Sequence, residues 1–166
     1  MWFVLVLTLA FGPAYAGAGQ QTTPVEPGGA RSALRHGLDV LHDWDSRREA
    51  AWAASDPSRL HRLYTPGSSA GRADVRLLRA YAVRGFVVRR LETQVFAVRV
   101  LRMTPRRITL RVLDRVAGGE LTSMRKPRPL VSTRPALRDV TFQRLGGDWV
   151  VSDVSARGPG PRGSRH

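Results

Sequence analysis

The sequence predicts an α+β domain in which three N-terminal helices pack on a strongly bent antiparallel sheet. Three observations support this fold class. Apolar residues recur at helical spacing in the first half of the folded region, alternate with a period of two in the second half, and are interrupted by glycine and proline between segments. A chain of 166 residues, 42% of them hydrophobic, suits one domain with a substantial core.

Three helices are expected first along the chain. Residues 31–55 carry apolar side chains at the helical period. The step Asp56-Pro57 supplies an N-cap and a first-turn proline, which predicts a short helix through Tyr64. A third helix is expected over residues 70–84, where a glycine follows and ends it.

Beyond the third helix the apolar period changes to two, which predicts strands. The first of them shifts its apolar phase at Val95, which predicts a β-bulge that bends it. Prolines mark residues 117–137 as an edge or a loop. Gly146 and Gly147 predict the turn of a hairpin between the last two strands. The predicted strands span residues 86–103, 107–116, 139–145 and 149–155.

The two ends of the chain differ in composition from the domain. Residues 2–11 form an apolar run too short to cross a bilayer, and Ala14 and Ala16 match a small-x-small cleavage site. We expect a signal peptide cleaved after Ala16, which exports the chain to the cell envelope or the medium; a buried N-terminal strand is the alternative. The expected parts are a signal peptide (1–16), a flexible linker (17–30), the α+β domain (31–155) and a disordered basic tail (156–166).

The composition excludes several classes of protein. Without cysteine the chain has no disulfide scaffold, no thiolate zinc site and no cysteine nucleophile. Its net charge of +14, from 27 basic and 13 acidic residues, is nearly all arginine, since Lys126 is the single lysine. Codon choice in a GC-rich genome accounts for part of this excess, but the positive field still attracts anionic polymers and lipid headgroups.

The step between the first two helices carries a family resemblance. The stretch AWAASDPSRLHRLY, from Ala51 to Tyr64, joins a long helix through Asp-Pro to an L-x-x-L-Y turn, and Gly147 and Trp149 form a closing G-x-W strand. With these motifs the chain resembles the nuclear transport factor 2-like (SnoaL-like) superfamily, as a secreted bacterial member. The resemblance implies a cone with a pocket between the first helix and the concave sheet, and sheet-to-sheet pairing in a homodimer. It implies no single function, because that superfamily includes isomerases, dehydratases, cyclases, transport adaptors and inert domains.

Three patterns in the sequence carry no chemistry. Residues 67–71 spell the G-x-S-x-G nucleophile elbow without its preceding strand or its partners, so we expect the serines to cap the third helix. Residues 158–163 spell a dinucleotide fingerprint with neither strand nor helix beside it. The histidines lack metal-ligand spacing, so we expect no metal and no cofactor. They are His36, His42, His61 and His166.

Charged residues occur where the pattern requires apolar ones. Asp45 and Arg48 fall in the same sector of the first helix as Leu38 and Leu41. Asp114 takes the inward phase of the second strand. Since a lone buried carboxylate costs several kcal/mol, these groups are expected to be paired, solvated in a pocket or shifted in pKa.

Two interpretations of these charges stay open. The first is a structural network that ties the first helix to the sheet, such as an ion pair between Asp114 and Arg48, with no catalytic residue. The second is a ligand pocket, either non-catalytic or that of a small-molecule isomerase, dehydratase or hydrolase. In the enzyme, Asp45 or Asp114 is the general base and Tyr64 or Tyr81 the hydrogen-bond donor. The resemblance implies an acid–base pair that includes a histidine, and His61 is the one histidine that could supply it. The residues expected to bind a ligand are Arg48, Trp52, Tyr64, Tyr81 and Asp114.

Arginines occupy mostly outward phases of the predicted strands, at positions 89, 99, 102, 107, 111 and 115. They form either a solvated face or a surface for polyanions; nucleic acid is not expected, because interleaved aromatics that stack bases are lacking. The sequence thus favours an exported, non-catalytic binding or interaction module of the cell envelope, whose pocket is plugged by an Asp–Arg pair or holds a small apolar ligand. The alternatives are the enzyme described above and an arginine-mediated binder of anionic envelope polymers or lipid surfaces.

Overall fold

The computed structural model describes residues 27–123 and 127–157. The predicted signal peptide, the linker up to residue 26, Lys126 and the tail beyond residue 157 lie outside the described residues. None of the described helices is long and apolar enough to cross a membrane.

Three helices form the N-terminal half: α1 (Pro27–Ala53), α2 (Pro57–His61) and α3 (Ser69–Val83). The predicted caps are present. The Asp56 carboxylate accepts hydrogen bonds from the backbone N–H groups of Ser58 and Arg59, at 3.0 and 2.9 Å. Ser68 Oγ accepts a hydrogen bond from the N–H of Gly71 at 3.2 Å, so the G-x-S-x-G stretch starts a helix, as expected.

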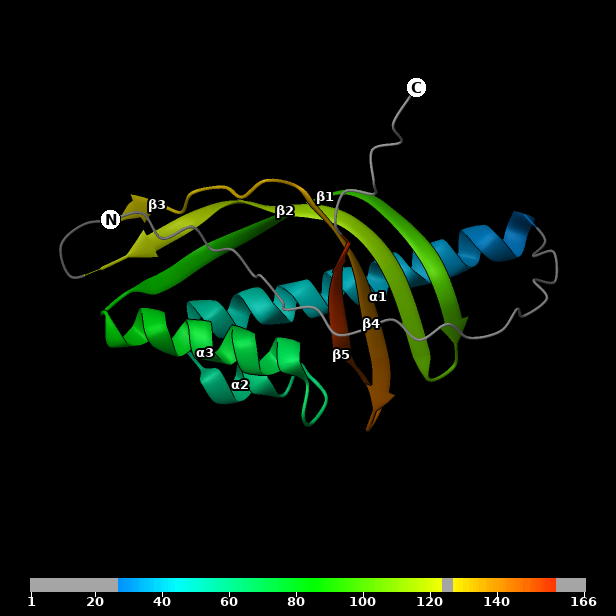
Figure 1. Ribbon diagram of the computed structural model, residues 1–166, viewed down its shortest axis with the longest axis horizontal. Helices are drawn as coiled ribbons and strands as arrows, with labels where there is room; N and C mark the ends of the chain where they lie inside the picture. Colours follow the sequence, from blue (N-terminus) through cyan, green and yellow to red (C-terminus); the bar gives the residue numbers. More distant parts are fainter. Residues whose placement is uncertain (1–26, 124–126, 158–166) are drawn as a thin grey trace, which may run out of the picture.

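The sheet has five strands: β1 (Val87–Thr104), β2 (Arg107–Thr122), β3 (Arg128–Pro129), β4 (Ala136–Leu145) and β5 (Asp148–Arg157). All pairs are antiparallel, in the order β1-β2-β4-β5, with β3 beside the end of β2. In Figure 1, β1 and β2 arch over α1, and α2 and α3 lie beneath it. The predicted hairpin turn between β4 and β5 is confirmed, and both of its glycines have positive φ angles.

Some element ends differ from the prediction. Because α1 begins at Pro27, residues 27–30 are helical and do not belong to a linker; a proline suits the first turn, where its missing N–H is not needed. β2 continues to Thr122, past the predicted end, because it still pairs with β1 there, where Val87 lies opposite. β5 extends to Arg157, so the first two residues assigned to the tail are in the sheet.

The second helix is shorter than predicted because the chain leaves it to pair with β5. α2 ends at His61, and Tyr64 forms an isolated bridge with Val151. The N–H of Val151 donates to the carbonyl of Leu63, and the N–H of Thr65 donates to the carbonyl of Val151, both at 2.9 Å. This bridge anchors the α2–α3 segment to the sheet.

The bend of the sheet has the predicted cause. The β1–β2 register shifts between Val95 and Ala97, and at three further places along β1. Extra residues in one strand increase its local twist and bend it. The bend turns the inner face of the sheet over α1, which creates the cone.

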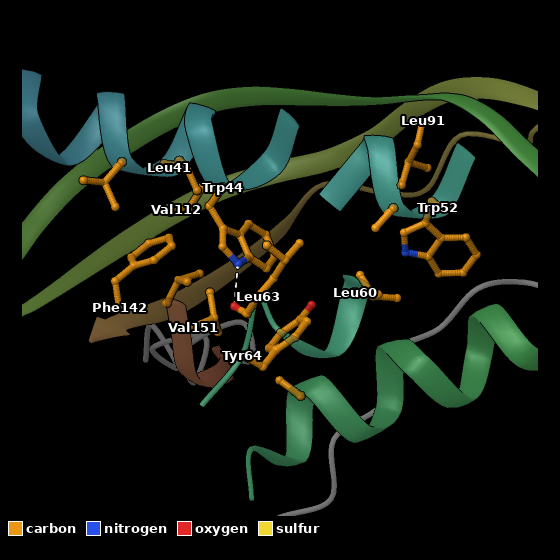
Figure 2. Packing of buried hydrophobic residues seen from close by; sticks show 14 of the residues in the cluster. Leu41, Trp44, Trp52, Leu60, Leu63, Tyr64, Leu91, Val112, Phe142 and Val151 are labelled. Atoms are coloured by element: carbon orange, nitrogen blue, oxygen red, sulfur yellow. Dashed lines mark hydrogen bonds between the residues drawn. The ribbon is translucent and has the colours of Figure 1, made fainter. Parts of the chain in front are cut away.

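The core fills the space between α1 and the inner face of the sheet (Figure 2). The indole of Trp44 packs edge-on against Phe142 and donates to the carbonyl of Leu63 at 2.9 Å. Gly37 lets α1 approach β2 closely, because a Cβ at this position would lie only 2.9 Å from Leu110 Cδ2. Close packing of large side chains therefore occupies most of the cone.

Candidate functional site

The main polar cluster inside the cone centres on Asp74 of α3. Its carboxylate accepts two hydrogen bonds from the Arg48 guanidinium, both at 2.7 Å. The hydroxyl of Tyr64 donates to it at 2.7 Å, and the indole N–H of Trp52 at 3.2 Å. Asp74 is 4% exposed. Since a carboxylate accepts about four hydrogen bonds, this one is saturated.

The electrostatics of this cluster fix its protonation. Burial alone would raise the pKa of the Asp74 carboxyl, but the charge of Arg48 and the hydrogen bonds from Arg48, Tyr64 and Trp52 outweigh it and hold the pKa below its usual value. Burial and the Asp74 charge raise the pKa of Tyr64. Burial would lower the pKa of Arg48, but its pairing with Asp74 raises it overall. The pair is therefore ionised and the phenol neutral, which leaves no proton ready for transfer.

Asp114 is buried on the inner face of β2, as its phase predicts, but its partner is not Arg48. Arg138 of β4 lies on the same face and its Nε donates to Asp114 Oδ1 at 2.8 Å. Arg48 is instead bound to Asp74, so the predicted ion pair between Asp114 and Arg48 is wrong. The physical reason is the strand register: Arg138 lies two positions from Ala136, the residue opposite Asp114, so the neighbouring strand already supplies a cation.

Asp45 is the one acidic residue of this region without an arginine bound to it among the described residues. It accepts a single hydrogen bond from the hydroxyl of Thr93, at 3.3 Å. Burial raises the pKa of Asp45, while the charges of Arg48 and Arg138 oppose this shift and the charge of Asp114 adds to it. Asp45, Arg48 and Asp114 thus share one electrostatic neighbourhood, as the sequence predicts.

The cavity between α1, α3 and the inner face of the sheet is almost closed. Its volume is about 20 Å³, enough for roughly one water molecule. Leu130, which follows β3, covers it on the sheet side, and Trp52 packs edge-on against Tyr81, at 5.9 Å between ring centres. The lining residues are Arg48, Trp52, Tyr81, Val88, Leu91, Val116 and Leu130.

A larger, open groove lies elsewhere, at the end of the β1–β2 arm. Its volume is about 330 Å³. Its charged lining residues are two arginines and two glutamates, so it selects neither sign of ligand. They are Arg90, Glu92, Glu120 and Arg128. None of the predicted site residues lines this groove.

The structure brings together part of the predicted site. Arg48, Trp52 and Tyr81 line the small cavity. The Tyr64 hydroxyl donates its hydrogen bond to Asp74, and the Asp114 carboxylate is bound by Arg138. His61 is exposed on α2, and the structure does not place it beside a carboxylate of the cone. It is therefore not in position for the acid–base pair that the enzyme interpretation requires.

Two residues of the site were not predicted from the sequence. Asp74 lies on the same stripe of α3 as Leu78 and Tyr81, four and seven residues later, so the sector test that found Asp45 would have found it. Arg138 precedes the buried Val140 by two residues and so shares its face of β4. In both cases the signal was a charge on an apolar face.

Residues 27–123 and 127–157 contain no group of three or more His, Asp or Glu side chains arranged to hold a metal ion. Of the carboxylates of the cone, Asp74 and Asp114 are bound by arginines instead. The cluster therefore has the chemistry of a structural polar network around a nearly filled interior.

No family model matches the chain, and no curated protein matches it significantly. Solved structures do match. One is a variant of Rv3472 of Mycobacterium tuberculosis, described as of unknown function, with a TM-score of 0.52 and 12% identity over 80% of this chain and 77% of that one. Another is Aln2 of a Streptomyces species, with a TM-score of 0.51 and 13% identity over 73% of this chain and 89% of that one.

An NTF2-like protein with a cystatin-like fold from Novosphingobium aromaticivorans also matches, with a TM-score of 0.46 and 15% identity over 76% of this chain and 84% of that one. Identities this low are informative about fold alone. The chain has the predicted α+β fold, in which three N-terminal helices pack on a strongly bent antiparallel sheet.

Proposed function

We propose that this chain is a non-catalytic binding or interaction module, exported to the cell envelope, that recognises its partner with its surface. The observation that carries the proposal is the nearly filled cone, whose cavity of about 20 Å³ is far below the several hundred Å³ of small-molecule sites. The saturated carboxylate of Asp74 supports it, since a general base needs a free lone pair.

The export half of the proposal rests on the apolar run and cleavage pattern before residue 17. A fusion of residues 1–30 to alkaline phosphatase without its own leader tests it. Export gives enzyme activity in intact cells, because this phosphatase folds only in an oxidising compartment. The matched control replaces Leu5 and Leu7 by arginine, which interrupts the apolar run and should abolish the activity. An inactive fusion contradicts the export half alone.

The closed cone is tested with a small apolar probe, such as indole, followed by NMR of the tryptophan side chains. The unmodified protein should give no shift at Trp52. Leu91→Ala should create space beside Trp52 and bind the probe, as apolar cavities of this kind do. Leu145→Ala, at a 39% exposed position on β4, is the control and should not bind it. Binding to the unmodified protein would instead favour a pocket that holds a small apolar ligand.

A second candidate, a small-molecule isomerase, dehydratase or hydrolase, is favoured by Asp45 alone. Its raised pKa and its single hydrogen bond are properties of a general base. However, Asp45 does not line the cavity, and His61 is exposed. A shift of the Thr93 amide signal on addition of the probe would revive this candidate, because a substrate has to lie beside Asp45.

A further inference from the structure

The outer face of the sheet, which points away from the helices, is dominated by arginine. Residues opposite each other in an antiparallel pair share a face, so the strand register defines its members. We call the following set the arginine face: Arg99, Arg102, Arg107, Arg111, Arg115 and Arg157. The carboxylates on the same stretch of the face are Asp139 and Asp153, so positive charge prevails.

Asp139 does not cancel this charge. It is buried between two arginines: Arg111 Nε and Arg157 Nε donate to its two oxygens, each at 2.8 Å. The hydrogen bond from Arg111 lowers the pKa of Asp139, burial opposes this, and Arg157 lowers it further. This triad holds two guanidinium groups in place around one carboxylate, so it keeps a net positive charge.

Three members of the arginine face have no hydrogen-bond or ion-pair partner among residues 27–123 and 127–157. The guanidinium groups of Arg99, Arg102 and Arg107 are exposed and make no hydrogen bond or ion pair with any residue that the structure describes. Arg99 also lies directly opposite Arg111 in the β1–β2 register. Like charges directly opposite are unfavourable in a sheet, and a bound anion would relieve this repulsion.

Apolar side chains lie among the arginines. Phe96 is 47% exposed, and the Arg115 guanidinium covers its ring at 5.6 Å from the ring centre. Leu113 lies opposite Leu137, which is 37% exposed. Such a surface resembles an interface, because arginine and aromatic residues are enriched in interfaces.

The charge of this face argues against a second copy as its partner. In a two-fold dimer the same patch meets itself, so sheet-to-sheet pairing would bring the arginines of two copies together. The shape argues against a bilayer. The outer face is convex, because β1 and β2 arch over α1 (Figure 1), and a flat membrane would touch only its crest. A flexible linear polyanion can follow the curve and reach all six arginines.

We propose that the arginine face binds a linear polymer that carries phosphate groups along its length and has no nucleobases, since the interleaved aromatic residues that stack bases are lacking. Guanidinium groups bind phosphate oxygens through two parallel hydrogen bonds, which a carboxylate-poor face leaves free to form. This inference deepens the function proposed above, since it names the class of partner for an envelope module, but its test depends neither on export nor on the closed cone.

The test measures binding of inorganic polyphosphate to the full chain as a function of salt. The variant R99Q/R102Q/R107Q removes these three arginines, and its fold should be unchanged because their guanidinium groups make no hydrogen bond or ion pair within the part of the chain that the structure describes. The matched control, R59Q/R76Q/R79Q, removes the same charge from exposed positions on α2 and α3. Orthophosphate and vesicles with anionic phospholipid are the comparison ligands.

The slope of log affinity against log salt concentration should fall by about 2 in the outer-face variant, since each contact to a single-stranded polyanion contributes about 0.7. The control should keep the slope of the unmodified protein. Equal losses in both variants would overturn the proposal in favour of general charge attraction. Tighter binding to vesicles than to polyphosphate, or dimerisation that the outer-face variant abolishes, would also overturn it.

Discussion

One buried aspartate bound by arginine lies inside the cone, and another lies on the outer face. Asp74 is held by Arg48 at 2.7 Å, and Asp139 by Arg111 and Arg157 at 2.8 Å. The carboxylates are equally hidden, with 4% and 5% exposed. Their partners are not: the Arg48 side chain is 17% exposed, whereas that of Arg157 is 53% exposed.

This difference teaches that distance alone does not give the strength of an ion pair. Two unit charges at 4 Å attract by about 4 kcal/mol at the effective dielectric of a protein, and by about 1 kcal/mol in bulk water. If Asp74 is lost, Arg48 stays enclosed by aromatic rings. If Asp139 is lost, water can hydrate the guanidinium groups of Arg111 and Arg157 without any rearrangement of the fold. The inner pair therefore holds the fold, and the outer triad shapes a surface.

The largest effect is expected from Asp74→Asn, which keeps the shape and removes the charge. It should destabilise the protein by about 3–5 kcal/mol, because it leaves a buried guanidinium without a counter-charge. Urea unfolding followed by tryptophan fluorescence measures this. Asp153→Asn, at an exposed position, is the control. A loss below about 1 kcal/mol would mean that water reaches Arg48 and that the inner and outer pairs are alike.

Asp114→Asn is an intermediate case, because its partner Arg138 is 32% exposed. Arg138 can turn toward water when its partner is lost, so we expect a destabilisation of about 1–2 kcal/mol. The same urea titration measures it. A loss as large as that of Asp74→Asn would show that the exposed part of Arg138 does not relieve the unpaired charge.

Asp139→Asn should lower the melting temperature by a few degrees at most, since the arginines it releases already face solvent. The difference from the unmodified protein should shrink in high salt. The same variant should bind polyphosphate more tightly, because one negative charge leaves the arginine face. Reduced binding of polyphosphate would mean that Asp139 is needed to position Arg111 and Arg157.

The smallest change in the free energy of unfolding, and the one that is an increase, is expected from Asp45→Asn. The folded-state pKa of Asp45 is raised, so its ionised form is unfavourable at neutral pH and the protein gains stability as pH falls through that pKa. Asp45→Asn should therefore be more stable at pH 7 by up to about 0.5 kcal/mol. The gain should vanish at acid pH, where Asp45 is protonated.

The contribution of Asp74 to the stability of the fold depends on pH in the opposite direction. Its folded-state pKa is lowered, so its contribution is present above the unfolded pKa of about 3.9 and is lost as pH falls through the folded value. Thermal unfolding of Asp45→Asn and of the unmodified protein between neutral and acid pH separates the two. A gain for Asp45→Asn that grows toward acid pH would contradict the assignment.

Much of the fold could be predicted because the patterns are local. The uninterrupted alternation of β2 placed Asp114 inside and Arg111 outside, and both are confirmed. The phase shift at Val95 located a bulge that the register contains. The ends of elements were less accurate: β2 extends to Thr122 and α2 stops at His61, because pairing with other strands decides both ends.

The sequence by itself determined which side chains face the interior, since a helix or strand repeats its orientation at a fixed period. It thus placed Asp45, Arg48 and Asp114 in one neighbourhood. Only the tertiary structure decided which charged side chains pair. Arg48 binds Asp74 of α3, 26 residues away, and Asp114 binds Arg138 of β4. The tertiary structure also decided that the cone is filled. Both outcomes depend on how closely distant segments approach, and no local period encodes that distance.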